Sequence, residues 1–193
     1  MKKHSLVFLA DGFEEVEAIT VIDYLRRAGI DVKICSIQGR EMVKGAHNIS
    51  VKADCLIEDL TASQAYDAVI LPGGLPGAYN LRDDGRVIEL IQTQIENGRL
   101  VAAICAAPVI LERAGLTKGR KGTSYPGFGG DLGFDEYSEA ICVRDGNIIT
   151  ARGPATAVYF ALEIIDYLLG AEAVAEIRDD ILLDLVEEEA CSN

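Results

Sequence analysis

The chain has 193 residues, of which 49% are hydrophobic, 25% charged and 6% aromatic, with no tryptophan. This composition is typical of a globular protein with one domain, and it excludes a disordered, collagen-like or coiled-coil chain. The 18 basic and 31 acidic side chains give a formal net charge of −13, and no basic stripe is visible in the sequence. We therefore expect no direct nucleic-acid partner.

The sequence also argues against export and against a membrane anchor. Only a short apolar run, residues 6–10, precedes Asp11, and no stretch of 18 apolar residues occurs. We expect neither a signal peptide nor a membrane-spanning segment. The five cysteines are odd in number and widely spaced, with no Cys-x-x-Cys pair: Cys35, Cys55, Cys105, Cys142 and Cys191. This pattern favours reduced thiols in the cytoplasm over a disulfide framework or a structural zinc site.

Strand and helix patterns alternate along the chain. Residues 5–10 are a continuous apolar run, typical of a strand buried on both faces, and residues 14–28 carry an apolar stripe at helical spacing that ends at Gly29. Further strands are predicted at residues 31–37, 68–71 and 100–104, and further helices at residues 85–96, 106–114, 154–169 and 171–185. Two hairpins are predicted: a weak one at residues 42–51, and one at residues 140–151 through Asp145-Gly146. The glycine-rich residues 119–133 indicate a long loop around a short strand.

This order predicts one domain, residues 1–193, with a largely parallel sheet and helices on both faces. The last part of the chain is strongly acidic, since residues 172–193 hold eight acidic side chains and one basic side chain. We expect a solvated helix face there, followed by a disordered acidic tail at about residues 186–193.

Chemistry-bearing residues follow three of the predicted strands. Ligands of an open α/β sheet bind beyond the carboxyl ends of its strands. Residues 11–17 follow the first strand, Gly73 and Gly74 follow residues 68–71, and Cys105 follows residues 100–104. We expect these loops to meet at one crevice.

Cys105 is the candidate nucleophile. It lies where an apolar strand ends and a helix is predicted to begin, so the helix terminus would favour its reactive thiolate form. The spacing alone is also compatible with an inert, buried thiol. The backbone N–H groups of Gly73, Gly74 and Ala106 are candidate donors to an oxyanion, although the two glycines also fit a simple turn. Glu17 is either a surface carboxylate or a partly buried carboxyl group with a raised pKa that can donate a proton.

The two histidines, His4 and His47, give little support to a catalytic triad. His4 opens the first strand at the edge away from the crevice, and His47 lies in the weak hairpin. The glycine-rich residues 119–133 contain no nucleotide-binding motif.

Together, five sequence blocks resemble the ThiJ/PfpI superfamily, in the branch of the Parkinsonism-associated deglycase and its bacterial relatives. They lie in register over residues 5–185: residues 11–17, 71–74, 102–108, 137–139 and 152–154. The resemblance implies a flavodoxin-like three-layer α/β sandwich, related to class I glutamine amidotransferases, and a homodimer. It also implies a nucleophilic, oxidation-sensitive Cys105, a protonated Glu17 against its sulfur, and oxyanion donors at Gly73, Gly74 and Ala106.

The family implies two functions for these residues. One is a cofactor-independent glyoxalase or deglycase, with no metal, that acts on methylglyoxal, glyoxal or early glycation adducts of amines and thiols. The other is a non-catalytic sensor of oxidative stress or a chaperone, controlled by oxidation of Cys105. The chain departs from well-known members at Tyr125, where they have a histidine. A tyrosine is a poor base near neutral pH, which argues against peptidase chemistry and leaves Tyr125 as a substrate-binding candidate.

Overall fold

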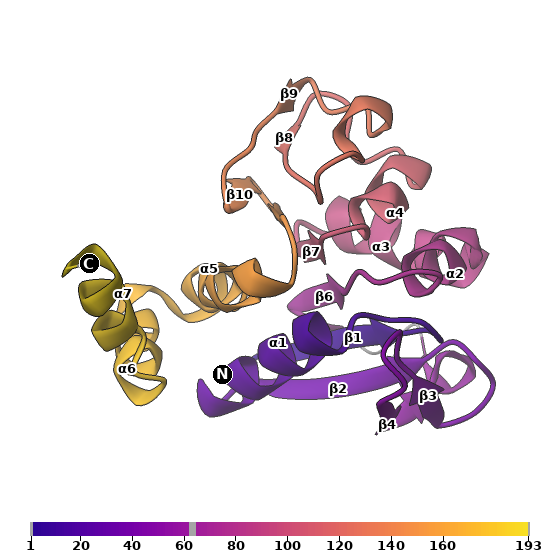
Figure 1. Ribbon diagram of the computed structural model, residues 1–193. Helices are drawn as coiled ribbons and strands as arrows, with labels where there is room; N and C mark the ends of the chain where they lie inside the picture. Colours follow the sequence, from indigo (N-terminus) through magenta and orange to yellow (C-terminus); the bar gives the residue numbers. More distant parts are fainter. Residues whose placement is uncertain (1, 62–64, 193) are drawn as a thin grey trace.

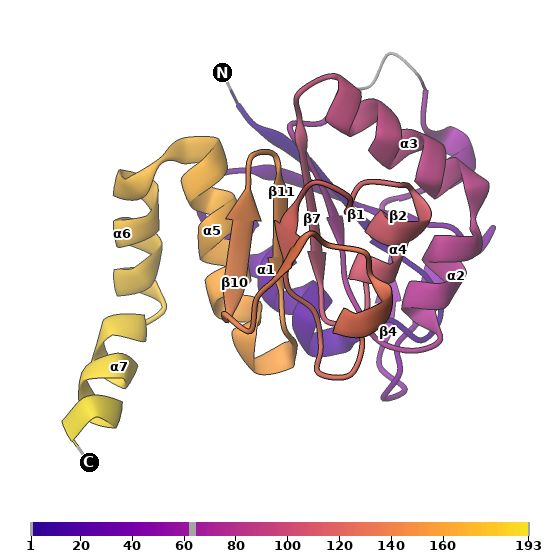
Figure 2. The same cartoon turned by 90° about the horizontal axis from the view of Figure 1, so that it is seen from above.

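The computed structural model describes residues 2–61 and 65–192. Helices cover both faces of a central seven-stranded sheet (Figures 1 and 2). The strand order is β10-β11-β7-β6-β1-β2-β5, and all neighbours are parallel except the hairpin β10–β11. Its strands are β1 (His4–Leu9), β2 (Asp31–Ser36), β5 (Cys55–Leu56), β6 (Ala68–Leu71), β7 (Leu100–Ile104), β10 (Cys142–Asp145) and β11 (Ile148–Ala151). The predicted α/β fold with a mostly parallel sheet is confirmed.

The remaining elements are helices and two small sheets. The helices are α1 (Glu15–Arg27), α2 (Gly77–Asp83), α3 (Gly85–Glu96), α4 (Pro108–Arg113), α5 (Ala157–Leu169), α6 (Ala171–Asp180) and α7 (Leu183–Ser192). Short 3₁₀ turns are η1 (Ile57–Asp59), η2 (Gly129–Asp131) and η3 (Pro154–Thr156). The small sheets pair β3 (Met42–Lys44) with β4 (Ser50–Lys52), and β8 (Lys121–Gly122) with β9 (Glu136–Tyr137). Among the described residues, no helix is long and apolar enough to cross a membrane.

The central strands are apolar throughout because both of their faces are buried. In β1, Val7 and Leu9 belong to one core cluster, which α1 and α5 cover, whereas Leu6 and Phe8 belong to a second cluster, which α3 and α4 cover. This alternation explains why the run of residues 5–10 has no polar side. It also sets the three layers of the fold.

The predictions differ from the structure in several places. The single helix expected over residues 171–185 is two helices, α6 and α7, because the chain breaks at Leu182, whose φ is +58°. The helix expected over residues 106–114 begins only at Pro108, because the preceding residues form a turn. The short elements α2 and β5 are not predicted by any pattern above. The expected disordered tail is wrong, because α7 continues to Ser192. Glu187 ties this helix to the rest of the chain, accepting a hydrogen bond from Tyr159 and pairing with Arg178.

The loops that follow β1 and β6 interlock at the carboxyl edge of the sheet. A Cβ atom on Gly12, whose φ is +85°, would lie 2.4 Å from the Cδ of Pro76. A Cβ atom on Gly74 would lie 2.3 Å from the backbone nitrogen of Glu14. The Glu14 N–H donates across the same gap to the Gly73 carbonyl at 2.9 Å. Backbone therefore packs directly on backbone, and this contact positions the first turn of α1.

We predict that Gly12→Ala destabilises the protein by about 2–4 kcal/mol, because the added methyl group meets Pro76 in a backbone conformation that alanine avoids. Gly39→Ala is the matched control: its φ is +64°, but nothing lies within 4 Å of the new Cβ, so only the backbone strain of about 1 kcal/mol remains. Urea unfolding measures both. Equal losses for the two variants would contradict the interlocked loops.

Candidate active site

Cys105 occupies a strained backbone position directly after β7. Its φ is +64°, a left-handed conformation that costs a residue with a side chain roughly 1–2 kcal/mol. Neighbouring strands and loops hold it in place: its N–H donates to the Ala151 carbonyl at 2.9 Å, and its carbonyl accepts from the Tyr125 N–H at 2.9 Å. Strain of this kind gathers at functional sites, where the surroundings enforce it.

Glu17 points from the first turns of α1 into the protein and is fully buried. Its Oε2 accepts a hydrogen bond from the Gly73 N–H at 2.8 Å. A Cβ atom on Gly73 would lie 2.7 Å from both Cys105 Cβ and Glu17 Oε2, so only glycine leaves room for the two side chains. The structure thus brings the three predicted loops together, and Glu17 is the buried alternative rather than a surface carboxylate.

Burial raises the pKa of Glu17 to about 7. Interactions with the Cys105 side chain and with the Gly73 N–H each lower the pKa of Glu17 in part. The charge of Glu14 raises it further. The second carboxyl oxygen, Oε1, is buried without a hydrogen-bond partner among the described residues. Because an ionised carboxylate would need partners for both oxygens, the environment favours a proton on Glu17.

The pKa of Cys105 is raised above its ordinary value, first by burial and then by the charge of Glu17. This differs from the expectation that a helix terminus favours the thiolate, since α4 is short and starts three residues later. The two groups titrate as a coupled pair that resists a second negative charge. With the proton on Glu17, the opposing charge is gone and a carboxyl O–H donor replaces it.

Backbone donors complete the surroundings of the sulfur. The N–H groups of Ala106 and Gly74 stabilise the Cys105 thiolate and lower its pKa in part. The sequence analysis named the Gly73 N–H as a candidate donor to an oxyanion. In the structure this N–H is bound to Glu17 instead. The candidate donors to a reacting oxygen are therefore Gly74 and Ala106.

Tyr125 lies at the rim of this site. Its backbone is bound to Cys105, and its ring is close enough to Gly153 that a Cβ there would lie 3.2 Å from the ring. The residue is about half-exposed.

The two histidines lie apart from Cys105. His4 opens β1 at the amino edge, as expected, and its ring contacts Asp31 at 3.1 Å. His47 instead binds Glu15 at the start of α1: its ring Nδ1 lies 2.9 Å from Oε2, and its N–H donates to Oε1 at 2.7 Å. Burial opposes ionisation of Glu15, but these bonds outweigh it and hold the pKa of Glu15 below its ordinary value. The same pairing raises the pKa of His47.

This contact docks the β3–β4 hairpin on α1 and is not anticipated by the sequence analysis. It joins residues 32 positions apart, and no local signal marks the pair. Ligand atoms of Glu14, Glu15 and His47 lie within 4.8 Å of one another, the spacing of a metal site. Since Glu15 is already satisfied by His47, the geometry describes an ion pair.

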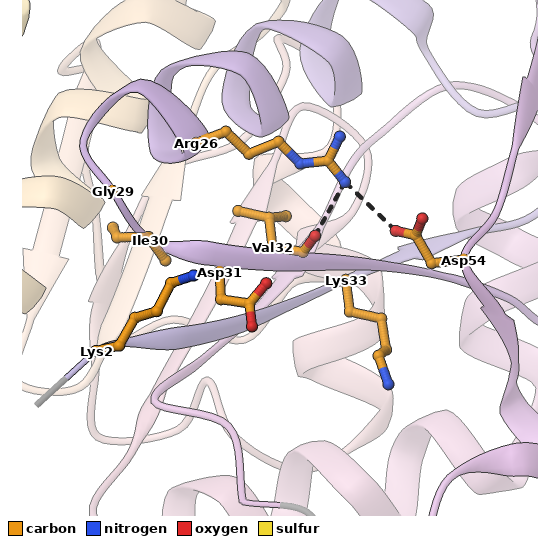
Figure 3. Close-up of a pocket in the computed structure, with 8 residues that line it drawn as sticks. All are labelled: Lys2, Arg26, Gly29, Ile30, Asp31, Val32, Lys33 and Asp54. Atoms are coloured by element: carbon orange, nitrogen blue, oxygen red, sulfur yellow. Dashed lines mark hydrogen bonds and ion pairs between the residues drawn. The ribbon is translucent and has the colours of Figure 1, made fainter.

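A cavity elsewhere on the molecule offers less chemistry than the Cys105 site. A space of about 450 Å³ lies at the amino edge of the sheet, where Arg26 donates to the Val32 carbonyl and pairs with Asp54 (Figure 3). The other lining residues are Lys2, Gly29, Ile30, Asp31 and Lys33. Their polar side chains are ordinary surface groups, so the buried thiol–carboxyl pair marks the candidate active site better than the cavity does.

The sequence and the fold of the chain are similar to those of known proteins. The model of the DJ-1/PfpI family matches residues 3–167. The chain is 40% identical to the Parkinson disease protein 7 homolog of Danio rerio, over 94% of this chain and 97% of the relative. It is 34% identical to a deglycase of Pyrococcus abyssi, over 84% of this chain and 98% of the relative. A solved structure, oxidized DJ-1 of Toxoplasma gondii, is 37% identical with a TM-score of 0.90, covering 93% of this chain and 98% of that one.

We predict that the proton on Glu17 makes stability depend on pH. Between about pH 5 and pH 7, folded Glu17 holds a proton that the unfolded chain releases, because the pKa falls from about 7 to about 4.5 on unfolding. The free energy of unfolding therefore decreases as the pH rises through this window. Urea unfolding measures the free energy of unfolding of wild type minus that of Glu17→Gln. This value should fall by about 2–3 kcal/mol from pH 5 to pH 8. A difference that stays constant with pH would mean that Glu17 is ionised in the folded protein.

Proposed function

Since this chain belongs to the DJ-1/PfpI family, we propose that it is a cofactor-independent, cysteine-dependent glyoxalase or deglycase. The observation that carries the proposal is the buried pair of Cys105 and Glu17, whose carboxyl pKa of about 7 suits proton transfer at neutral pH. The proposed substrates are methylglyoxal, glyoxal and early glycation adducts of amines or thiols. The archaeal relative named a deglycase supports this class of reaction.

The first step forms a bond between the Cys105 sulfur and the aldehyde carbon of the substrate. Glu17 and Cys105 share a proton, so the sulfur attacks as thiolate while the carboxyl group holds that proton. The carbonyl oxygen becomes an alkoxide, which the N–H groups of Gly74 and Ala106 stabilise before Glu17 protonates it. The product is a hemithioacetal, and Glu17 is left ionised as a base.

The second step moves hydrogen within the substrate. Ionised Glu17 takes the proton from the former aldehyde carbon of methylglyoxal, and the resulting enediol is reprotonated at the neighbouring carbon. This gives a hydroxy-acyl thioester on Cys105. Water then attacks the thioester carbonyl, releases lactate and restores the thiol. Oxidation of one carbon balances reduction of the next, so the sequence needs no redox cofactor or metal.

Two further features support the proposal, one for substrate binding and one for the cellular compartment. Tyr125, exposed at the rim, contributes its hydroxyl as a hydrogen-bond donor to the bound substrate. All five cysteines are unpaired in the structure, which fits a protein that works in the reducing cytoplasm.

The experiment is lactate formation from methylglyoxal by purified protein. We predict that Cys105→Ser reduces turnover to background and that Glu17→Gln reduces kcat by at least a hundredfold, because it keeps the shape of the side chain but cannot exchange the proton. Cys191→Ser is the matched control, since this thiol is exposed in α7 and should leave turnover unchanged. Full activity of Cys105→Ser would refute the proposal.

A redox sensor or chaperone is the second candidate function. Two observations favour it: the buried Glu17 Oε1 has no hydrogen-bond partner among the residues that the structure describes, and a solved relative is described as oxidized DJ-1. A sulfinic acid on Cys105 would accept a hydrogen bond from protonated Glu17. The lactate assay separates the two candidates, because a sensor forms no lactate. Peptide mapping after limiting peroxide should then find the sensor's first sulfinic acid at Cys105.

We further propose that two copies of the chain pair through the exposed apolar side of α1 and the adjoining hairpin. Val16, Ile19 and Ile49 are about half-exposed there, and the Ile49 N–H contacts Glu15. Exposed apolar side chains of this size gather at interfaces.

Sedimentation should therefore give twice the mass of the chain, and Ile19→Lys should shift the protein toward the monomer. Val186→Lys is the control: Val186 is even more exposed, but lies far along the chain on α7. A wild-type protein that sediments as a monomer at micromolar concentration would rule out the dimer.

A further inference from the structure

Two cysteines that the proposed chemistry does not use are neighbours at the edge of the sheet. Cys35 lies near the carboxyl end of β2 and Cys55 begins β5, and the parallel pairing places them directly in register. Neighbouring strands lie about 4.8 Å apart. Both side chains belong to the core cluster that α3 and α4 cover, so they share one face of the sheet. This separation lies within the range that a disulfide bridges.

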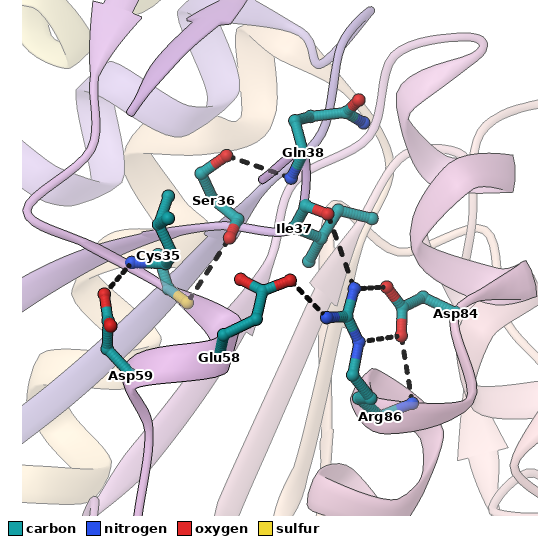
Figure 4. Close-up of polar contacts among 9 residues, drawn as sticks. Cys35, Ser36, Ile37, Gln38, Glu58, Asp59, Asp84 and Arg86 are labelled. Atoms are coloured by element: carbon teal, nitrogen blue, oxygen red, sulfur yellow. Dashed lines mark hydrogen bonds and ion pairs between the residues drawn. The ribbon is translucent and has the colours of Figure 1, made fainter. Parts of the chain in front are cut away.

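The two sulfurs interact and have no strong competing partner. Burial raises the pKa of both thiols; the neighbouring Cys55 raises that of Cys35 further, whereas Cys35 lowers that of Cys55 in part. Each sulfur otherwise makes one long contact with a backbone carbonyl: Cys35 with Ser36 at 4.0 Å, drawn in Figure 4, and Cys55 with Ile34 at 3.8 Å. These contacts are long and weak, so little hydrogen bonding is lost when the sulfurs turn toward each other.

The strand that carries Cys55 is the weakest part of the sheet. β5 has two residues and lies at the edge. Beyond the ladder, an ion pair between Glu58 and Arg86 at 2.6 Å holds the following turn to α3 (Figure 4). Both charged side chains are about half-exposed, and such pairs contribute little to stability. Local opening of this edge exposes Cys55 before Cys35, which is fully buried.

We propose that Cys35 and Cys55 form a reversible intramolecular disulfide when the protein meets a hydroperoxide, independently of Cys105. Cys55 is the attacking thiol, since it is the more accessible of the two. Its thiolate takes one oxygen from the peroxide O–O bond, giving a sulfenic acid and water (or an alcohol). The Cys35 sulfur then attacks the Cys55 sulfur, displacing the oxygen as a second water and leaving the S–S bond. The peroxide is reduced by two electrons, and the two thiols supply them.

The disulfide would restrain a segment that supports the candidate active site. It closes a loop over residues 36–54, which includes the β3–β4 hairpin. That hairpin docks on the start of α1 through the Ala46 N–H, bound to the Phe13 carbonyl at 2.9 Å, and through His47 on Glu15. Because the crosslink removes freedom from the unfolded chain, we expect it to raise the Tm by roughly 5–10 °C.

The experiment maps thiols after treating the native protein with hydrogen peroxide. Remaining thiols are blocked with N-ethylmaleimide, and the protein is digested with trypsin without reduction. Trypsin places Cys35 in the peptide of residues 34–40 and Cys55 in the peptide of residues 53–82, so a disulfide joins two otherwise separate peptides. We expect the joined peptides, their separation by dithiothreitol, and a band of single-chain mass on a non-reducing gel.

Cysteine-to-serine variants show which thiols form the crosslink. Cys35→Ser and Cys55→Ser should each abolish the joined peptides and the rise in Tm, whereas Cys105→Ser and Cys142→Ser should keep both. Circular dichroism confirms that the variants are folded. The proposal is overturned if both thiols remain open to N-ethylmaleimide while Cys105 is oxidised, if each is converted to a sulfinic acid without a crosslink, or if the joined peptides come only from a band of double mass.

Discussion

The candidate site is built around one constraint: a carboxyl group and a thiol share a buried space that tolerates a single negative charge. Glu17 is fully buried, and burial with the neighbouring charge of Glu14 raises its pKa to about 7. Cys105 faces the same penalty and resists ionisation while Glu17 is charged. Each group therefore decides the protonation of the other, which is the condition that proton-coupled attack by sulfur requires.

The rest of the fold holds this pair in place. Buried strands bring three loops to one edge of the sheet, and close backbone contacts at Gly12, Gly73 and Gly74 lock those loops together. The strained backbone of Cys105 is held between Ala151 and the loop of Tyr125. Small residues are needed here for a geometric reason: any Cβ atom at these glycines would occupy the space of a neighbouring loop.

Much of the fold could be predicted because its signals are local. The apolar run of residues 100–104 and the amphipathic residues 85–96 coincide with β7 and α3 to the residue. Two of the failures depend on contacts distant in sequence: the Gly73 N–H is bound to Glu17, and α7 is tied down through Glu187. Glu17 and Cys105 were named as candidates, but their burial and the direction of the thiol pKa follow only from how the loops meet. The catalytic roles of both residues remain predictions.

The most direct test of the shared proton is a pH titration of the Glu17 carboxyl carbon by NMR, with the signal assigned by its absence in Glu17→Gln. The account predicts a midpoint near pH 7 in the wild type. Cys105→Ala should move this midpoint upward, because the interaction with the thiol lowers the pKa of Glu17. A wild-type midpoint between pH 4 and 5, the ordinary range of an exposed glutamate, would contradict the account.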